Sequence, residues 1–280
     1  MRDLICSSMA GAALILIAGC TTVYNPATER TETVISTPVE IALGNLARAQ
    51  MGLTSLQMGR VDPEKTARVQ RIGRRLARVS DRQDVTYQFG VIQEKTLNAF
   101  ALPGGTLYVH SVLVDQATDD ELASVIAHEI GHVAARHAAK HLQADLGFTL
   151  LVNLAGATGA GTEAARVANS LYGLFRNGYS RSDELAADRL GLRYAARAGY
   201  NPQGMVTFFE KMLAEESENP LDRAFVWQRT HPLTSERIRR AKEEIGRMAG
   251  ESFCPECGRS YSAQVRFCAR DGTPLRKKGS

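Results

Sequence analysis

Apolar residues recur at helical spacing through the middle of the chain. The spacing is three or four positions along the chain, as on the buried face of a helix, for Leu122, Val125 or Ile126, and Ile130. Directly before them, Thr118-Asp119-Asp120-Glu121 has the pattern of a capping box, with threonine as the N-cap and glutamate three residues later. We therefore predict a buried helix that begins just after the threonine.

The pattern on either side predicts a mainly helical body with a few strands. Residues 39–59 are expected to be helical, and Asp62-Pro63 places an N-cap and a first-turn proline at the start of a helix that extends to about Val79. Residues 85–93 and 107–110 are rich in β-forming residues and are bounded by turn residues. Further helices are predicted over residues 180–198, from residue 201, and over residues 234–248. The predicted fold class is α+β, mainly helical, with a small antiparallel sheet.

Residues 146–175 form a stretch that is rich in glycine, alanine and leucine. This composition fits a helical hairpin, a lid or an element that contacts a membrane. Simple packing against the body is the default interpretation.

The first twenty residues have the pattern of an export signal. A charged start precedes an apolar run from Leu4 to Ala18, which is short for a membrane span. The run ends Leu16-Ile17-Ala18-Gly19-Cys20, which resembles a bacterial lipobox whose cysteine becomes the lipidated first residue. Thr21 after it resembles the pattern of lipoproteins sent to the outer membrane. The alternative is an anchor helix that is not cleaved.

Bulk composition excludes some classes of function. The chain has 280 residues and a formal net charge of +4, with acidic and basic residues interspersed, so nucleic-acid binding is not indicated. Its five cysteines lie near the two ends, which argues against a disulfide-based scaffold.

Two histidines near the centre of the predicted helix are placed to bind one metal ion. His128-Glu129-Ile130-Gly131-His132 spells H-E-x-x-H, and residues four apart lie about 40° apart around a helix axis. Both imidazoles can therefore reach one ion, for which zinc is the usual choice. Zinc lowers the pKa of a bound water to about 7, and the Glu129 carboxylate can take the proton. The motif thus provides two ligands and a general base.

A catalytic zinc ion needs three protein ligands and an open position for water. His137 lies nine residues after His128, about 180° around a continuous helix, so it and His141 are predicted to be surface residues. Glu184 and Asp188 are better placed, because E-x-x-x-D puts both carboxylates on one helix face. Glu184 would bind zinc, and Asp188 would accept a hydrogen bond from a ligating imidazole and fix its tautomer.

Four motifs occur in the order seen in one enzyme family. They are N-A-F-A-L-P-G-G over residues 98–105, H-E-x-x-H over residues 128–132, Glu184 with Asp188, and Thr230-His231-Pro232 with Arg237. Over about residues 60–248 the chain resembles the HtpX and CAAX-protease family of gluzincin zinc metalloendopeptidases, and in particular periplasmic lipoproteins such as LoiP and BepA. The tetratricopeptide array of BepA and the internal membrane helices of HtpX have no counterpart in this sequence.

The resemblance implies a role for each matching residue. His128, His132 and Glu184 would bind zinc, Glu129 would act as catalytic base and acid, and Asp188 would support a ligand. His231 matches a histidine that approaches the zinc ion, where it would either fill the open position in a latent state or donate to the oxyanion. These two alternatives stay open.

A peptide substrate is expected to pair with an edge strand of the sheet, as in many zinc peptidases. Residues 99–110 are the candidates for this strand and its turn. Asn98, Ala99, Gly104 and Gly105 are the residues that the sequence points to most directly.

A second zinc site is predicted at the C-terminus. Cys254-Pro255-Glu256-Cys257 is one zinc knuckle, and Cys268 with Asp271 has the spacing of a second one in which aspartate replaces a cysteine. The pattern resembles small zinc-ribbon modules, whose role here would be to bind a partner protein. In an oxidising compartment two of the thiols would be able to form a disulfide instead.

Together these observations predict a membrane-anchored zinc endopeptidase. Its domains would be a lipoprotein signal peptide (1–19), a tether (20–38), a zinc metalloprotease domain (39–249) and a zinc-ribbon-like module (250–280). Lipidated Cys20 would hold it in the periplasm, on the outer membrane, where unfolded or misassembled proteins would be its substrates. The alternative is a chaperone-like lipoprotein with little proteolytic activity, although the intact Glu129 argues against it.

Overall fold

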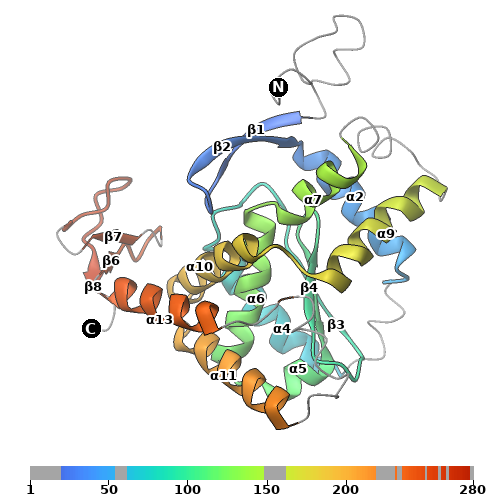
Figure 1. Ribbon diagram of the computed structural model, residues 1–280. Helices are drawn as coiled ribbons and strands as arrows, with labels where there is room; N and C mark the ends of the chain where they lie inside the picture. Colours follow the sequence, from blue (N-terminus) through green and yellow to red (C-terminus); the bar gives the residue numbers. More distant parts are fainter. Residues whose placement is uncertain are drawn as a thin grey trace, which may run out of the picture.

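A small mixed sheet lies at the centre of the fold, with helices against both faces (Figure 1). Its strands β3 (Gln88–Ile92), β4 (Ala99–Leu102) and β5 (Thr106–His110) stand in the order β3-β5-β4. β4 and β5 form an antiparallel hairpin, whereas β5 runs parallel to β3. The prediction of an antiparallel sheet is therefore correct for the pair β4 and β5 and wrong for the pair β3 and β5. The reason is that β5 lies between the other two strands and runs in the same direction as β3.

The computed structural model describes residues 20–53, 62–147, 162–218, 231, 235–249, 251–257, 260–262 and 265–277. The predicted signal peptide, the side chain of Cys20 and half of the stretch 146–175 lie outside the described residues. No helix among the described residues is both long enough and apolar enough to span a bilayer.

Side chains of the sheet point alternately into two apolar clusters. Leu107 and Val109 join the larger cluster, which includes residues of α4 (Pro63–Ala77), α6 (Asp119–Ala134), α10 (Arg181–Arg197), α11 (Gln203–Glu218) and α13 (Ser235–Ala249). Tyr108 joins the smaller one, with α2 (Thr37–Gln50), α7 (His137–Leu146) and α9 (Thr162–Asn177). The described part of the stretch 146–175 thus packs against the body.

The central helix α6 begins as the sequence predicts. The Thr118 side chain accepts a hydrogen bond from the Glu121 N–H, and the Glu121 carboxylate accepts one from the Thr118 N–H, which completes a capping box. A short helix, α5 (Ser111–Gln116), precedes it. α6 is buried on nearly every side, from Glu121 to Ala134, so its motif residues are held inside the domain.

Two glycines allow α6 and α10 to cross in direct backbone contact. A β-carbon on Gly131 would lie 2.8 Å from the Ala187 carbonyl oxygen, and one on Gly191 would lie 2.9 Å from the His128 nitrogen. Real β-carbons essentially never come that close. The crossing therefore needs glycine at both positions, and it brings the carboxylates of α10 next to the histidines of α6.

A cluster of buried charges fixes α2 to the end of α6. Arg82 donates to both carboxylate oxygens of Glu40 at 2.9 and 2.7 Å, and Arg136 donates to the same carboxylate at 2.8 Å. All three side chains are at most 5% exposed. Arg136 has a left-handed backbone (φ 57°), which ends α6 and turns the chain into α7.

Most of the segment predicted to be a tether forms two strands. β1 (Cys20–Asn25) and β2 (Arg30–Ile35) form an antiparallel hairpin. Its second strand contacts α7, where the Ile35 N–H donates to Gln143 and Lys140 pairs with Glu32. Threonine is frequent in this segment and is a good strand residue.

A small C-terminal sheet follows α13 and projects from its end (Figure 1). Its strands β6 (Glu251–Phe253), β7 (Ser260–Ser262) and β8 (Arg276–Lys277) stand in the order β7-β6-β8, with both pairings antiparallel.

Candidate active site

The two motif histidines face each other inside the domain. His128 Nε2 and His132 Nε2 are 3.0 Å apart, and each residue is 1% exposed. The one-turn spacing on α6 produces this arrangement, as the sequence predicted. Two imidazole nitrogens that point at one position in a buried site are suited to a shared metal ion.

Glu184 of α10 completes a triangle of ligand atoms. Its carboxylate oxygens lie 3.5 Å from His128 Nε2 and 3.4 Å from His132 Nε2. Atoms bound about 2.0–2.1 Å from a tetrahedral zinc ion are separated from one another by about 3.3 Å. The observed separations match this spacing, so the residues present fit a zinc ion.

His231 supplies a fourth donor atom at the same spacing. Its Nδ1 lies 3.2 Å from His128 Nε2 and 3.0 Å from Glu184 Oε1, and the residue is 2% exposed. Together with His132, these side chains place four donor atoms within 4.8 Å of one another. The geometry favours the first of the two roles considered for His231, that of a ligand in the fourth position.

Asp188 and Arg237 support the ligands from behind. Asp188 Oδ1 lies 2.9 Å from His128 Nδ1, and Asp188 is one turn along α10 from Glu184. Arg237 on α13 donates to both oxygens of Asp188 at 2.7 Å, and its Nη1 lies 2.7 Å from Glu184 Oε2. Asp188 thus lies where the sequence predicted. Arg237 appeared in the sequence only as part of a motif, and its ion pairs are evident only in three dimensions.

His137 is a buried partner of a ligand, which corrects the prediction that it lies on the surface. Its Nδ1 is 2.8 Å from His132 Nδ1, and its Nε2 is 3.4 Å from Asp183 Oδ1. The prediction assumed a helix that continues through residue 137, whereas α6 ends at Ala134 and the left-handed Arg136 redirects the chain. No residue type in this stretch signals the break.

The charges of the ligands suit metal binding. Burial lowers the pKa of His132 to about 3, although Glu184 opposes the shift, so this imidazole is neutral. Burial would raise the pKa of Glu184, but His231 and Arg237 hold it well below its ordinary value. Burial would likewise lower the pKa of His128, but hydrogen bonds to Asp188 and Glu184 raise it to about 9. Metal binding through the Nε2 atom of His128 is therefore expected to release a proton.

Glu129 lies beside the ligands without being one of them. Its carboxylate is 1% exposed, lies 3.3 Å from His231 Nε2, and accepts a hydrogen bond from the backbone of Ala101 in β4. Burial raises the pKa of Glu129 above its ordinary value of 4.5, although His231 and His128 oppose the shift. A carboxylate with a raised pKa is a stronger base at neutral pH.

The strand beside Glu129 is an edge strand among the described residues. β4 pairs with β5 on one side only. Of the four residues that the sequence pointed to, Ala99 opens this strand, and Asn98 precedes it and accepts a hydrogen bond from the Ala99 N–H at 2.9 Å. Gly104 and Gly105 instead form the turn into β5, with φ values of 82° and 97° that favour glycine.

The C-terminal sheet brings together a second set of possible metal ligands. Donor atoms of Cys254, Cys257, Cys268 and Asp271 lie within 4.8 Å of one another. The Cys257 and Cys268 sulfurs are 3.5 Å apart, well beyond the roughly 2.05 Å of a disulfide bond. The Cys254 sulfur lies 3.8 Å from each Asp271 carboxylate oxygen. Sulfurs bound about 2.3 Å from a tetrahedral zinc ion would be about 3.8 Å apart, so this set also fits.

Several characterised proteases resemble the chain in sequence. The beta-barrel assembly-enhancing protease of Escherichia coli (strain K12) is 31% identical over 201 residues, which are 67% of this chain and 40% of that protein. The mitochondrial metalloendopeptidase OMA1 of Schizosaccharomyces pombe is 33% identical over 181 residues, 64% of this chain and 52% of that protein. The metalloprotease LoiP of Escherichia coli (strain K12) is 34% identical over 167 residues, 58% of this chain and 64% of that protein.

The chain thus spans between 40% and 64% of the length of these relatives. The sequence profile of one peptidase family matches residues 63–245, a range that includes both histidines of the H-E-x-x-H motif, Glu184, His231 and Arg237. By this match and by the site that these residues build, the chain belongs to peptidase family M48.

Proposed function

We propose that this chain is a zinc-dependent endopeptidase that acts on misfolded or misassembled proteins of the cell envelope. As a member of peptidase family M48 it is a metalloprotease. The observation that carries the proposal is the set of four donor atoms at tetrahedral spacing with the buried Glu129 beside them. A site with only a structural metal ion would have no need of this carboxylate.

Each residue of the site would have its own role in peptide-bond hydrolysis. His128, His132 and Glu184 would hold zinc, which when bound polarises the scissile carbonyl and lowers the pKa of water. Glu129 accepts a proton from the attacking water and delivers it to the leaving amine nitrogen. The backbone of Ala101 lies beside this carboxylate, and burial excludes competing solvent.

An extended polypeptide is the substrate that the site would accept. β4 presents an open edge next to Glu129, and peptide strands can add to such an edge through main-chain hydrogen bonds. Unfolded chains offer extended segments that folded proteins do not. The name of one relative, the beta-barrel assembly-enhancing protease, suggests proteins that assemble as β-barrels as the class of substrate. Lipidation of Cys20 would anchor the enzyme to the outer membrane, and loss of palmitate labelling in Cys20→Ala would support this anchor.

His231 would keep the enzyme latent by occupying the fourth ligand position. Its Nδ1 lies as close to the other donors as they lie to one another, so water would enter only after His231 has moved. We expect His231→Ala to raise the basal rate of cleavage. A lower rate with unchanged zinc content would instead favour a role in stabilising the oxyanion.

The C-terminal cluster would hold a second, structural zinc ion. Strands of two or three residues bury too little apolar surface to stabilise this small sheet, so a metal ion would have to hold it together. The exposed Phe267, 59% accessible, would be available to a partner protein.

One pair of variants tests the catalytic proposal. Glu129→Gln should retain zinc and lose the ability to cleave an unfolded protein such as reduced casein. Glu64→Gln, a change at an exposed position of α4, should retain both properties. Cleavage by Glu129→Gln at the rate of the unmodified enzyme would refute the proposed role.

Zinc content per purified chain tests the two metal sites separately. We expect two zinc ions in the unmodified chain, one in Glu184→Ala and one in Cys254→Ser. A single zinc ion that is lost only in Glu184→Ala would remove the proposal of a structural site.

A further inference from the structure

A tyrosine outside the set of donor residues covers one face of His132. The Tyr179 ring is stacked on the His132 imidazole, with 3.9 Å between the ring centroids and 23° between the ring planes. Aromatic pairs commonly have centroids about 4.5–7 Å apart, so this contact is a close one. The same ring lies 6.0 Å from the His231 ring and 5.9 Å from the His137 ring. Tyr179 thus contacts the candidate metal site through its ring.

The link between α9 and α10 places this tyrosine. Gly178 follows the last residue of α9, donates its N–H to a carbonyl of that helix at 2.8 Å, and turns the chain with a left-handed backbone (φ 81°). Ser180 is the N-cap of α10, and its side chain accepts a hydrogen bond from the Asp183 N–H. Tyr179 stands between these two helix ends, so its backbone is fixed on both sides.

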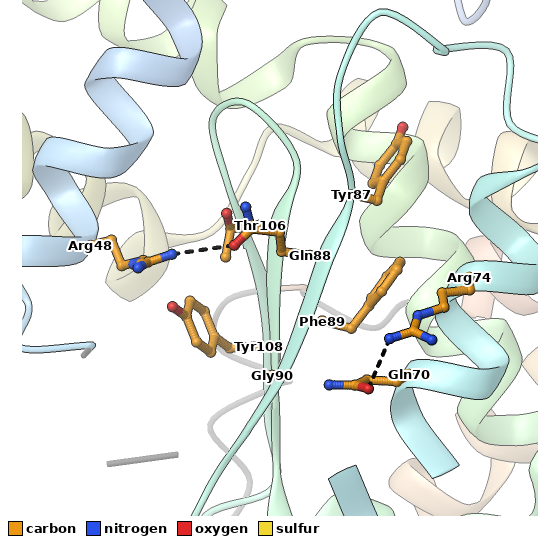
Figure 2. Close-up of a pocket in the computed structure, with 9 residues that line it drawn as sticks. All are labelled: Arg48, Gln70, Arg74, Tyr87, Gln88, Phe89, Gly90, Thr106 and Tyr108. Atoms are coloured by element: carbon orange, nitrogen blue, oxygen red, sulfur yellow. Dashed lines mark hydrogen bonds between the residues drawn. The ribbon is translucent and has the colours of Figure 1, made fainter. Parts of the chain in front are cut away.

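A narrow hollow beside β4 shows how closely the tyrosine ring is packed. It is lined by His132 and Tyr179 together with Ala101 and Pro103, among others, and its volume of about 10 Å³ is enough for about one water molecule. The imidazole therefore has little room to rotate while the tyrosine ring is in place. The larger groove at β3, of about 280 Å³, is lined by none of the four donor residues (Figure 2).

The two motif histidines differ in what supports them. His128 Nδ1 lies 2.9 Å from the Asp188 carboxylate, a charged partner that orients the imidazole. His132 Nδ1 instead lies 2.8 Å from an imidazole nitrogen of His137. A partner at this nitrogen directs the His132 ring within its plane, whereas a stacked ring resists rotation out of that plane. Tyr179 thus supplies a restraint that the contact with His137 does not.

The stack is expected to be stronger when the metal ion is bound. An imidazole that gives electron density to a zinc ion carries more positive charge than a free one, and the face of a phenol ring attracts positive charge. Contact between His132 and Tyr179 therefore favours the loaded site over the empty one. Its contribution should appear in zinc affinity and not only in the stability of the fold.

We propose that Tyr179 is a positioning residue, whose ring holds the His132 imidazole in the orientation that binds zinc. The inference rests on the zinc site of the proposed function and adds to it a residue that is not itself a ligand. It assigns the role to the aromatic ring and not to the phenol hydroxyl. Phenylalanine at this position should therefore serve as well as tyrosine, and an aliphatic residue should not.

Competition for zinc with a chromogenic chelator tests the proposal. Every protein is the full chain with Cys254→Ser, so that the C-terminal cluster does not add a second ion. Tyr179→Leu, which removes the ring and keeps an apolar side chain, should weaken zinc binding about tenfold, the upper end of what one aromatic pair contributes. Tyr179→Phe should bind zinc as the parent does. So should the matched control Tyr172→Leu, which changes a tyrosine of α9 that is 65% exposed.

The absorption spectrum of the cobalt(II)-loaded proteins separates positioning from simple packing. Its bands depend on the geometry of the ligands, so Tyr179→Leu should change them and Tyr179→Phe should not. If leucine prevents folding, Tyr179→Met repeats the test with a side chain that adapts to irregular space.

Three results would overturn the proposal. The first is a loss of stability in urea for metal-free Tyr179→Leu with unchanged zinc affinity and an unchanged cobalt spectrum, because the ring would then serve packing alone. The second is an equal loss of zinc affinity in Tyr179→Leu and Tyr179→Phe, because the hydroxyl would then carry the effect. The third is a parent chain that binds no zinc, which would refute the proposed function as well.

Discussion

Replacing Gly191 by alanine tests whether the close crossing of α6 and α10 sets the geometry of the metal ligands. The new methyl group would lie 2.9 Å from the His128 nitrogen and 3.0 Å from its α-carbon. An ordinary contact begins at 3.4 Å, so the two helices must separate by about 0.5 Å, a displacement typical of overpacked cores. The movement separates Glu184 and Asp188 from the histidine that they contact.

The expected magnitude follows from two opposing effects. Overpacking of a core costs about 1–3 kcal/mol, whereas alanine in place of glycine within a helix gains about 1 kcal/mol. We expect a net loss of about 1 kcal/mol in the free energy of unfolding. Displaced support of metal ligands typically lowers metal affinity about 10- to 100-fold, and we expect a loss in this range for zinc.

Two measurements check the prediction: competition for zinc with a chromogenic chelator, and unfolding in urea. Gly246→Ala is the control, because a β-carbon at this position of α13 would have no neighbour within 4 Å. It should leave zinc affinity unchanged and increase stability. If Gly191→Ala binds zinc as tightly as the parent while the control behaves as expected, the reasoning is wrong.

Three further predictions concern groups outside the ligand set. His137→Ala should weaken zinc binding about tenfold in the same competition assay, because His132 loses the partner of its Nδ1; an unchanged affinity would show that this contact does not support the ligand. Glu40→Ala should lower the free energy of urea unfolding by about 3–5 kcal/mol, because it leaves two buried arginines without their shared carboxylate. Hydrogen bonding to Arg71 lowers the pKa of Asp119 below its ordinary value of 3.8, so its contribution is present above pH 3.8 and is lost as the pH falls through the lowered pKa. Asp119→Asn should therefore destabilise the protein at pH 7 by at most about 1 kcal/mol, and urea titrations should show this difference shrinking at pH 3; a constant difference would contradict the assignment.

The parts of the site that the sequence predicts are those set by one helix at a time. His128 and His132 are one turn apart, and so are Glu184 and Asp188, so each pair shares a helix face whatever the rest of the chain does. The capping box at Thr118 is local in the same sense. That the two helices meet was inferred from the need for a third ligand, and the structure brings them together.

The parts that the sequence does not predict depend on contacts between distant residues. Glu40 pairs with arginines 42 and 96 positions away, and nothing near it distinguishes it from a solvated acid on a helix. The burial of His137 depends on a change of direction at Arg136, a residue type with no particular preference for a left-handed backbone. The parallel pairing of β3 with β5 likewise depends on strand order rather than on the pattern within either strand.

Burial of the four donor residues also has a kinetic consequence. His128, His132 and Glu184 are each 1% exposed and His231 is 2% exposed, so a chelator has no direct path to an ion that they hold. Removal of the metal must wait for a local opening of the protein. The rate of inactivation by a chelator should then level off as its concentration rises, and the plateau would report how often the closed centre opens.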